Sequence, residues 1–120
     1  MARRCFHPPP MFLRKLDDYP VIEARFHGDA RLEFLDSVAH YEAIQVGLGD
    51  RFRQSVEAAV QLATALPYAG APYKYGTRRI FPKKFPFSVI YLVGKNEIVI
   101  FAVAHFKRRP DYWRRRRLDC

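Results

Sequence analysis

The side chains best suited to chemistry are gathered near the end of the sequence. The stretch AHFKRRPDYWRRRR, residues 104–117, contains seven basic side chains and one acidic side chain, with His105, Tyr112 and Trp113 among them. Arginine can hold a phosphate with paired hydrogen bonds, an aromatic ring can stack on an unpaired base, and histidine can transfer protons near neutral pH. This combination predicts contact with a polyanion.

Each of these side chains also has a purely structural interpretation. A histidine at the end of an apolar strand is as often a hydrogen-bonded structural residue, and a tryptophan in this position is typical of a residue that closes a core. The arginines at 114–117 follow the last expected strand, where they could form a tail without fixed geometry. Arg78 and Arg79 are neighbours in an expected strand, so we expect them to point to opposite faces of the sheet.

The charge of the chain is strongly positive and unevenly distributed. The net charge is +9; residues 29–57 hold six acids against three bases, whereas residues 74–84 hold five bases and no acid. Such asymmetry favours an anionic partner, either a nucleic acid or an acidic protein. Solubility alone is the alternative explanation, because net charge governs association and not fold.

Length and composition define the class of protein. With 120 residues, of which 49% are hydrophobic and 15% aromatic, the chain has the apolar surface for one folded domain. Cys5 and Cys120 make neither a disulfide scaffold nor a zinc motif, so we expect no metal or cofactor and a cytoplasmic location. The start lacks the apolar run of a secretory signal, and no stretch is long enough to span a bilayer, so we expect no membrane contact.

Hydrophobic periodicity predicts the elements that must position these residues. The expected order is β-α-α-β-β-β: a strand at 20–26, a helix at 29–45, a helix between the break at 47–50 and Pro67, and strands at 76–81, 85–93 and 98–106. An α+β fold, with the helical hairpin packed on a small antiparallel-rich sheet, buries both apolar helix stripes. We expect residues 20–113 to form this domain, after an N-terminal extension at 1–19 and before a basic tail at 114–120.

The same periodicities assign side chains to faces of the elements. Alternation in the last strand places four side chains together: Phe101, Val103, His105 and Lys107. The expected apolar helix stripes are Phe34, Leu35, Val38, Tyr41 and Ile44 in the first helix, and Phe52, Val56, Ala59, Val60, Ala63 and Leu66 in the second. We expect Asp29 to cap the first helix and Glu42 to be solvated.

Four segments occur in an order and spacing that point to a known family. They are residues 30–42, which begin with alanine and end in Tyr-Glu, then GLGDRF at 47–52, RRIFPKKFPFSVIYLV at 78–93 and IVIFAVAHFKRRPDYW at 98–113. Together they resemble the toxins of the RelE/ParE superfamily, which are the toxic halves of bacterial type II toxin–antitoxin pairs of the plasmid-stabilisation kind. The resemblance covers about residues 20–114 and implies the same β-α-α-β-β-β fold.

What the resemblance implies for activity divides in two. RelE-like members bind RNA and are ribosome-dependent endoribonucleases, which cleave mRNA by driving the ribose 2′-hydroxyl onto the neighbouring phosphate. ParE-like members instead poison DNA gyrase without hydrolysis. Both kinds form hetero-oligomers with a cognate antitoxin, which binds a groove of the toxin through an acidic or amphipathic segment. A basic nucleic-acid-binding domain without toxicity is a third hypothesis.

We expect ribosome-dependent mRNA cleavage as the activity, with gyrase poisoning as the alternative. Cleavage needs side chains that transfer protons and side chains that stabilise a charged phosphate. The expected catalytic residues are His105, Tyr112 and Arg79, and the expected phosphate-binding residues are Arg78, Lys107, Arg108 and Arg109. The family topology also implies that the strand at 76–81 and the last strand lie together, which would bring an arginine near Lys107. In the gyrase hypothesis, the same C-terminal basic segment docks on gyrase or its DNA.

Overall fold

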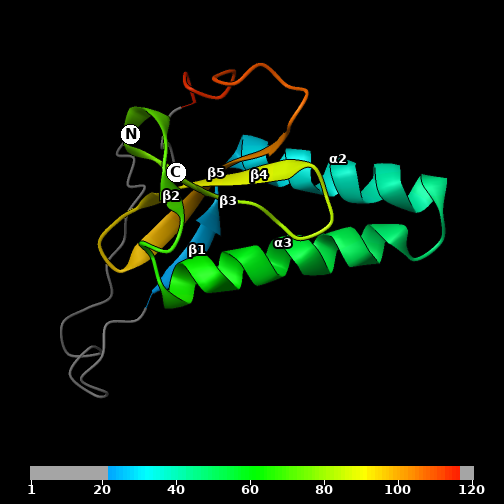
Figure 1. The fold of residues 1–120 in the computed structure, drawn as a ribbon, viewed down its shortest axis with the longest axis horizontal. Coiled ribbons are helices and arrows are strands. Elements are labelled where there is room, and N and C mark those ends of the chain that lie inside the picture. Colours follow the sequence, from blue (N-terminus) through cyan, green and yellow to red (C-terminus); the bar gives the residue numbers. More distant parts are fainter. Residues whose placement is uncertain (1–21, 117–120) are drawn as a thin grey trace, which may run out of the picture.

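The computed structural model describes residues 22–116, so the expected extension at 1–19, both cysteines and Arg117 lie outside the described residues. The elements are β1 (Glu23–Phe26), α2 (Gly28–Ile44), α3 (Leu48–Ala65), β2 (Ala71–Pro72), the 3-10 turn η1 (Lys74–Gly76), β3 (Arg78–Ile80), β4 (Phe87–Val93) and β5 (Glu97–His105). The two long helices form an antiparallel hairpin, and the strands form one sheet beside it (Figure 1). This arrangement confirms the expected α+β fold.

The sheet has five strands in the order β1-β5-β4-β3-β2. β1 is parallel to β5, whereas each of the other neighbouring pairs is antiparallel. The two-residue strand β2 was not expected from the sequence, because Ala71 and Pro72 show no alternation. The expectation that β3 and β5 lie together is wrong, since β4 separates them in the sheet.

The main core lies between the helical hairpin and the sheet. In α3 the expected stripe is confirmed at Phe52, Val56, Ala59 and Ala63, which are buried, whereas Leu66 at its end is 59% exposed. The α2 stripe is narrower than expected: Phe34, Val38 and Tyr41 pack on the core, but Leu35 and Ile44 are exposed. His27 caps this helix in place of Asp29, because its Nδ1 accepts a hydrogen bond from the Asp29 N–H at 3.0 Å.

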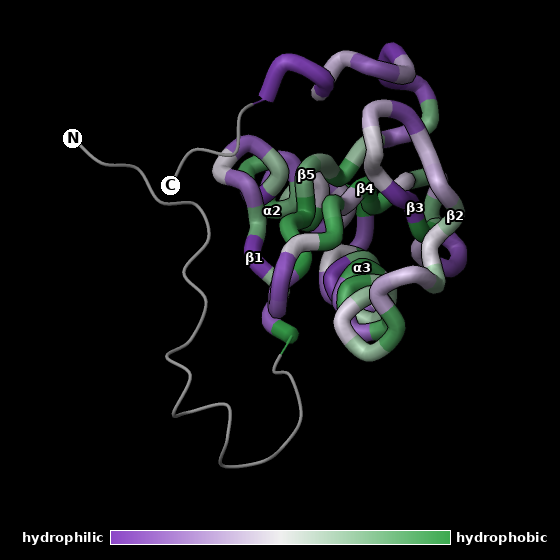
Figure 2. The backbone as a smooth tube through the Cα atoms, turned by 90° about the vertical axis from the view of Figure 1, so that its left-hand side faces the viewer, coloured by the Kyte–Doolittle hydropathy of each residue, from purple (hydrophilic) through white to green (hydrophobic). Residues whose placement is uncertain are grey.

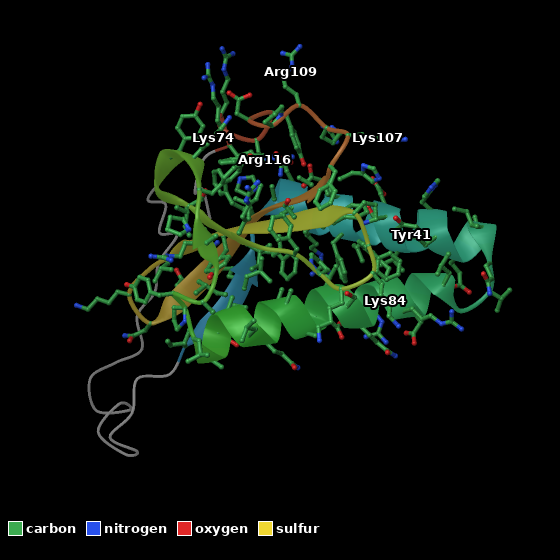
Figure 3. The ribbon with its side chains drawn as sticks, in the orientation of Figure 1. Tyr41, Lys74, Lys84, Lys107, Arg109 and Arg116 are labelled. Atoms are coloured by element: carbon green, nitrogen blue, oxygen red, sulfur yellow. The ribbon has the colours of Figure 1, made fainter. Side chains whose placement is uncertain are left out.

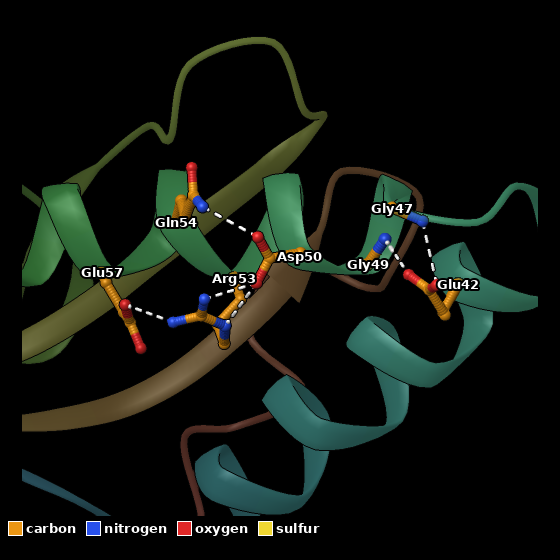
Figure 4. Close-up of polar contacts among 7 residues, drawn as sticks. All are labelled: Glu42, Gly47, Gly49, Asp50, Arg53, Gln54 and Glu57. Carbon is orange, nitrogen blue, oxygen red and sulfur yellow. Dashed lines mark hydrogen bonds and ion pairs between the residues drawn. The ribbon is translucent and has the colours of Figure 1, made fainter.

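The turn between the helices depends on a carboxylate and two glycines. Glu42 is exposed, as expected, but it also caps α3: its carboxylate oxygens accept hydrogen bonds from the N–H groups of Gly47 at 2.9 Å and Gly49 at 3.0 Å (Figure 4). Gly47 has a φ of +90°, which favours glycine. A Cβ at Gly49 would lie 2.5 Å from the carbonyl oxygen of Val38, so the close approach of the helices requires glycine there.

A β-bulge in β5 shifts the alternation of its side chains between the two faces of the sheet. Tyr91 pairs with Ile100 and Ile90 pairs with Ala102, so Phe101 is the extra residue. Phe101 therefore belongs to a second apolar cluster on the sheet face away from the helices, whereas Val103 belongs to the main core. The expectation that Phe101 shares a face with Val103 and His105 is wrong, because the bulge interrupts the period of two.

Candidate functional site

The chain after β5 crosses the sheet on the side away from α3 (Figures 1 and 2). We call residues 106–116 the C-terminal segment. Trp113 holds it in place: this side chain is 1% exposed and lies against Phe101 at 5.7 Å and Tyr75 at 5.8 Å between ring centroids. The packing interpretation of Trp113 is confirmed. A buried indole of this size contributes most of the apolar contact that fixes such a segment.

The outer side of the C-terminal segment is densely basic. Lys107, Arg108, Arg109, Arg114 and Arg115 are exposed, and Lys107 and Arg109 project away from the sheet (Figure 3). A groove of about 370 Å³ is lined by Arg109, Asp111, Tyr112, Arg114 and Arg115. The name basic surface is used below for the five exposed basic residues: Lys107, Arg108, Arg109, Arg114 and Arg115.

The acid in this groove neutralises little of the positive charge. Asp111 lies 3.7 Å from Arg114, and within residues 22–116 no carboxylate pairs with Arg109 or Arg115. Two cations are therefore available to an anionic partner, and a guanidinium group suits phosphate or carboxylate equally well.

A partly buried polar network joins this segment to α2. The carboxylate of Glu33 accepts hydrogen bonds from the Tyr112 hydroxyl and from Arg116, each at 2.5 Å to Oε2, and from the Val103 N–H at 3.0 Å to Oε1. Burial raises the pKa of Tyr112 well above its usual range, and the hydrogen bond to Glu33 raises it further. The hydroxyl therefore stays protonated and donates to Glu33.

The run of arginines is not the loose tail that the sequence suggested. The side chain of Arg116 is 13% exposed, and it forms an ion pair with Glu33, whose side chain is 15% exposed. The expectation of a tail without geometry is therefore wrong at Arg116. Arg114 is exposed but also contacts Asp111 and the Tyr75 hydroxyl, the latter at 3.3 Å.

His105 lies at the end of β5 on the face that the helices cover. It pairs with Phe87 in the β4–β5 ladder, and the two rings meet edge to face with centroids 5.0 Å apart. Its Nδ1 accepts a hydrogen bond from the Lys107 N–H at 2.9 Å. The imidazole is thus held by a ring and a backbone group, an arrangement that fits the structural interpretation of this histidine.

Arg78 and Arg79 point to opposite faces, as expected for strand neighbours. Arg78 donates to the carbonyl oxygens of Gly70 at 2.7 Å and Tyr68 at 3.3 Å, and its guanidinium group lies over the Tyr68 ring. Arg79 lies over the ring of Tyr73 at 4.0 Å, on the face that carries the C-terminal segment. Arg78 and Arg79 therefore both have structural partners, and Arg79 lies on the sheet face away from the helices.

The structure brings together only some of the expected site residues. Arg79 and Tyr112 lie on the sheet face away from the helices, and the C-terminal segment that covers this face contains Lys107, Arg108 and Arg109. His105 faces the helices on the other side of the sheet. Glu33 was missed, because nothing in its sequence context separates it from the other acids of α2; only its contacts mark it out.

A second surface lies between α3 and the loop that joins β3 to β4. It is a groove of about 660 Å³ with an apolar floor that includes Ala59, Leu62 and Ile80. Its rim carries the cations Arg51, Lys83 and Lys84. The Ser55 hydroxyl donates to the Lys83 carbonyl oxygen at 2.7 Å and so fixes the loop against the helix. No pattern in the sequence indicates this groove, because its two sides are about 28 residues apart.

Between residues 22 and 116, no three His, Cys, Asp or Glu side chains gather closely enough to hold a metal ion. No helix in the same range combines the length and apolar character that crossing a membrane requires.

Comparison with known proteins supports the fold. No protein-family model matches the sequence, and no curated protein matches it significantly. Among solved structures, the chain is similar to one described as "Chromosomal ParDE TA system from P. aeruginosa", with a TM-score of 0.64 and 21% sequence identity. The match covers 72% of this chain and 98% of that chain. The chain therefore has the ParE-like α+β fold that the sequence resemblance implied.

Proposed function

We propose that this chain is the toxin of a type II toxin–antitoxin pair. The observation that carries the proposal is the fold shared with a chain of a ParDE toxin–antitoxin system, because the match spans nearly all of that chain. The quoted sequence segments, which resemble toxins of the RelE/ParE superfamily, support the toxin over the antitoxin. A toxin must engage both a cellular target and its antitoxin, and the basic surface and the groove beside α3 support a division of these two roles.

We further propose that the toxin acts by binding its target, as ParE-like members do with DNA gyrase. Cleavage of RNA would need His105, Tyr112 and Arg79 to converge on one phosphate, but the first faces the helices and the other two face the opposite side of the sheet. The Tyr112 hydroxyl is also engaged by Glu33. The basic surface, in contrast, is exposed and suited to docking on an anionic partner.

The second surface suits the antitoxin. The groove between α3 and the β3–β4 loop has an apolar floor, and Phe81 in its lining is 50% exposed. Its rim is basic, with Arg51, Lys83 and Lys84. These features complement a helix with one apolar face and acidic flanks. We therefore propose an acidic amphipathic segment of the antitoxin as the occupant of this groove.

Induced expression of the full chain in bacterial cells tests the function. We expect growth to stop, gyrase–DNA cleavage complexes to accumulate, and mRNA to stay intact in primer-extension assays. Cuts at ribosome-bound codons would overturn the binding mode and establish the ribosome-dependent mRNA cleavage that the nuclease hypothesis predicts. Unimpaired growth at full expression would overturn the toxin proposal and leave a basic nucleic-acid-binding domain. Charge reversal of Lys83 and Lys84 should weaken rescue by a co-expressed antitoxin without changing toxicity.

A further inference from the structure

The strand β5 extends beyond the strand that covers its edge. β1 pairs with residues 97–100 of β5, and the last backbone contact on this side is the His27 N–H donating to the Ile100 carbonyl oxygen at 2.9 Å. The chain then turns into α2 at Gly28, whereas β5 continues to His105. Among residues 22–116, no strand therefore lies beside the edge of β5 beyond Ile100. Buried backbone groups on such an edge need other hydrogen-bond partners.

Two side chains supply those partners. The Val103 N–H donates to Glu33 Oε1 at 3.0 Å, and the Phe101 carbonyl oxygen accepts from an Arg116 guanidinium nitrogen at 3.0 Å. The same guanidinium group is paired with the Glu33 carboxylate. Glu33, the acceptor, and Arg116, the donor, are thus bonded to each other as well as to β5.

The pattern of these bonds matches that of a parallel strand. In a parallel ladder, one residue donates its N–H to the carbonyl of residue i and accepts from the N–H of residue i+2 on its neighbour. Arg116 donates to residue 101 and Glu33 accepts from residue 103, so the pair satisfies the same two groups. β1 is itself parallel to β5, and the ion pair follows on directly from where β1 ends.

We propose that the Glu33–Arg116 pair replaces one residue of a parallel strand at the β5 edge, and that this link positions the C-terminal segment and its basic surface on the sheet. Glu33 and Arg116 are then positioning residues. The link joins α2, β5 and the C-terminal segment at one point, and the Tyr112 hydrogen bond to Glu33 strengthens it. This role goes beyond the proposed toxin function. Of the tests described below, only the measurement of growth depends on that function.

An ion pair that is held only by its opposite charges would respond differently to mutation from a pair that replaces a strand residue. If only opposite charges matter, exchanging them should preserve the contact. If the pair replaces a strand residue, the exchange fails, because an arginine at position 33 offers a donor to the Val103 N–H, which is also a donor. A neutral glutamine at position 33 keeps an acceptor oxygen and should still serve the Val103 N–H.

Amide hydrogen exchange on the purified full chain separates these cases. We expect Glu33→Ala to speed exchange at the Val103 amide at least about tenfold, because the amide loses its partner. Glu33→Gln should keep the exchange rate at Val103 within about threefold of the original. Loss of a whole hydrogen bond would change this rate more. The double variant Glu33→Arg with Arg116→Glu should exchange as fast as Glu33→Ala. The Ile100 amide, which lies on the β1 side of β5 like the Ile100 carbonyl oxygen bonded to His27, should stay protected in all variants that fold.

The opposite pattern overturns the proposal. Protection at Val103 that survives Glu33→Ala, or that returns with the exchanged charges, would show that the pair does not replace a strand residue. Glu57→Ala is the matched control, since it removes an ion pair whose side chains are 39% and 51% exposed on α3. It should leave exchange at Val103 unchanged.

Proteolysis and growth test the positioning role. Arg116→Met keeps a long apolar side chain but removes the donor, so trypsin should cut after Arg114 at least about tenfold faster than in the original chain. The same variant should weaken growth inhibition, whereas Glu57→Ala should not. Equal trypsin rates would overturn the positioning role. If the original chain does not inhibit growth, the toxin proposal fails, while hydrogen exchange and proteolysis still decide the role of the pair.

Discussion

His105 lies directly opposite Phe87 in the β4–β5 ladder, with ring centroids 5.0 Å apart, on the sheet face that the helices cover. The expected partners for catalysis, Arg79 and Tyr112, lie on the other face. A sheet of packed side chains separates the two groups. A single phosphate therefore has no access to all three, and this relationship is the main support for our proposal that the chain binds its target and does not cut RNA with these residues.

The first prediction concerns His105. We expect His105→Ala to leave growth inhibition within about twofold of the original, because loss of a general acid or base would cost about a hundredfold or more. Growth after induction measures it, and His40→Ala, an exposed histidine on α2, is the control. A fall of about a hundredfold in toxicity, with codon-specific mRNA cuts lost at the same time, would return His105 to a catalytic site.

The helix junction gives a stability prediction. Gly49→Ala should lower the free energy of unfolding by about 1–3 kcal/mol, because the new Cβ would meet the Val38 carbonyl oxygen and the Glu42 side chain. Urea denaturation measures the change. Gly28→Ala is the matched control at the start of α2, where a Cβ meets nothing within 4 Å. Equal stability of the two variants would show that the helices can move apart without cost.

Tyr112 gives a prediction on pH. Burial, followed by the hydrogen bond to Glu33, raises its pKa above the usual 10.0, so the unfolded chain loses this proton at a lower pH than the folded chain does. The stabilising contribution is therefore complete below pH 10 and is lost as pH rises above it. Tyr112→Phe should make the fall of the unfolding free energy with rising pH less steep between about pH 10 and 11. An unchanged slope in alkaline urea titrations would contradict this account.

The basic surface gives a prediction on salt. Replacing Arg109 and Arg115 with glutamine should weaken binding to a DNA duplex, and each lost phosphate contact should reduce the slope of log affinity against log salt by about one. Fluorescence anisotropy at several salt concentrations measures it. Arg53→Gln is the control and should leave the slope unchanged, because Arg53 on α3 is already paired with Asp50 and Glu57 (Figure 4). Identical slopes for all variants would exclude this surface from polyanion binding.

Local patterns determined much of the fold. The spacing of Phe52, Val56, Ala59 and Ala63 predicted α3 and its buried face, because a helix shows one stripe whatever it packs against. The apolar runs around Val89 and Val99 predicted the central strands β4 and β5. The opposite facing of Arg78 and Arg79 followed from the strand period alone. The order of elements and the excess of basic charge near the end were also set by the sequence.

Other features depended on contacts between distant residues. The bulge at Phe101 comes from the pairing of β4 with β5, and strand alternation cannot show where a register shifts. Glu33 and Arg116 are 83 positions apart, so only the folded chain brings this acid and this base together at an uncovered strand edge. The sequence by itself determined the two long helices, the strands other than β2, the fold class and the charge. The tertiary structure decided which faces those charges occupy, because side-chain direction there depends on register and packing and not on local pattern.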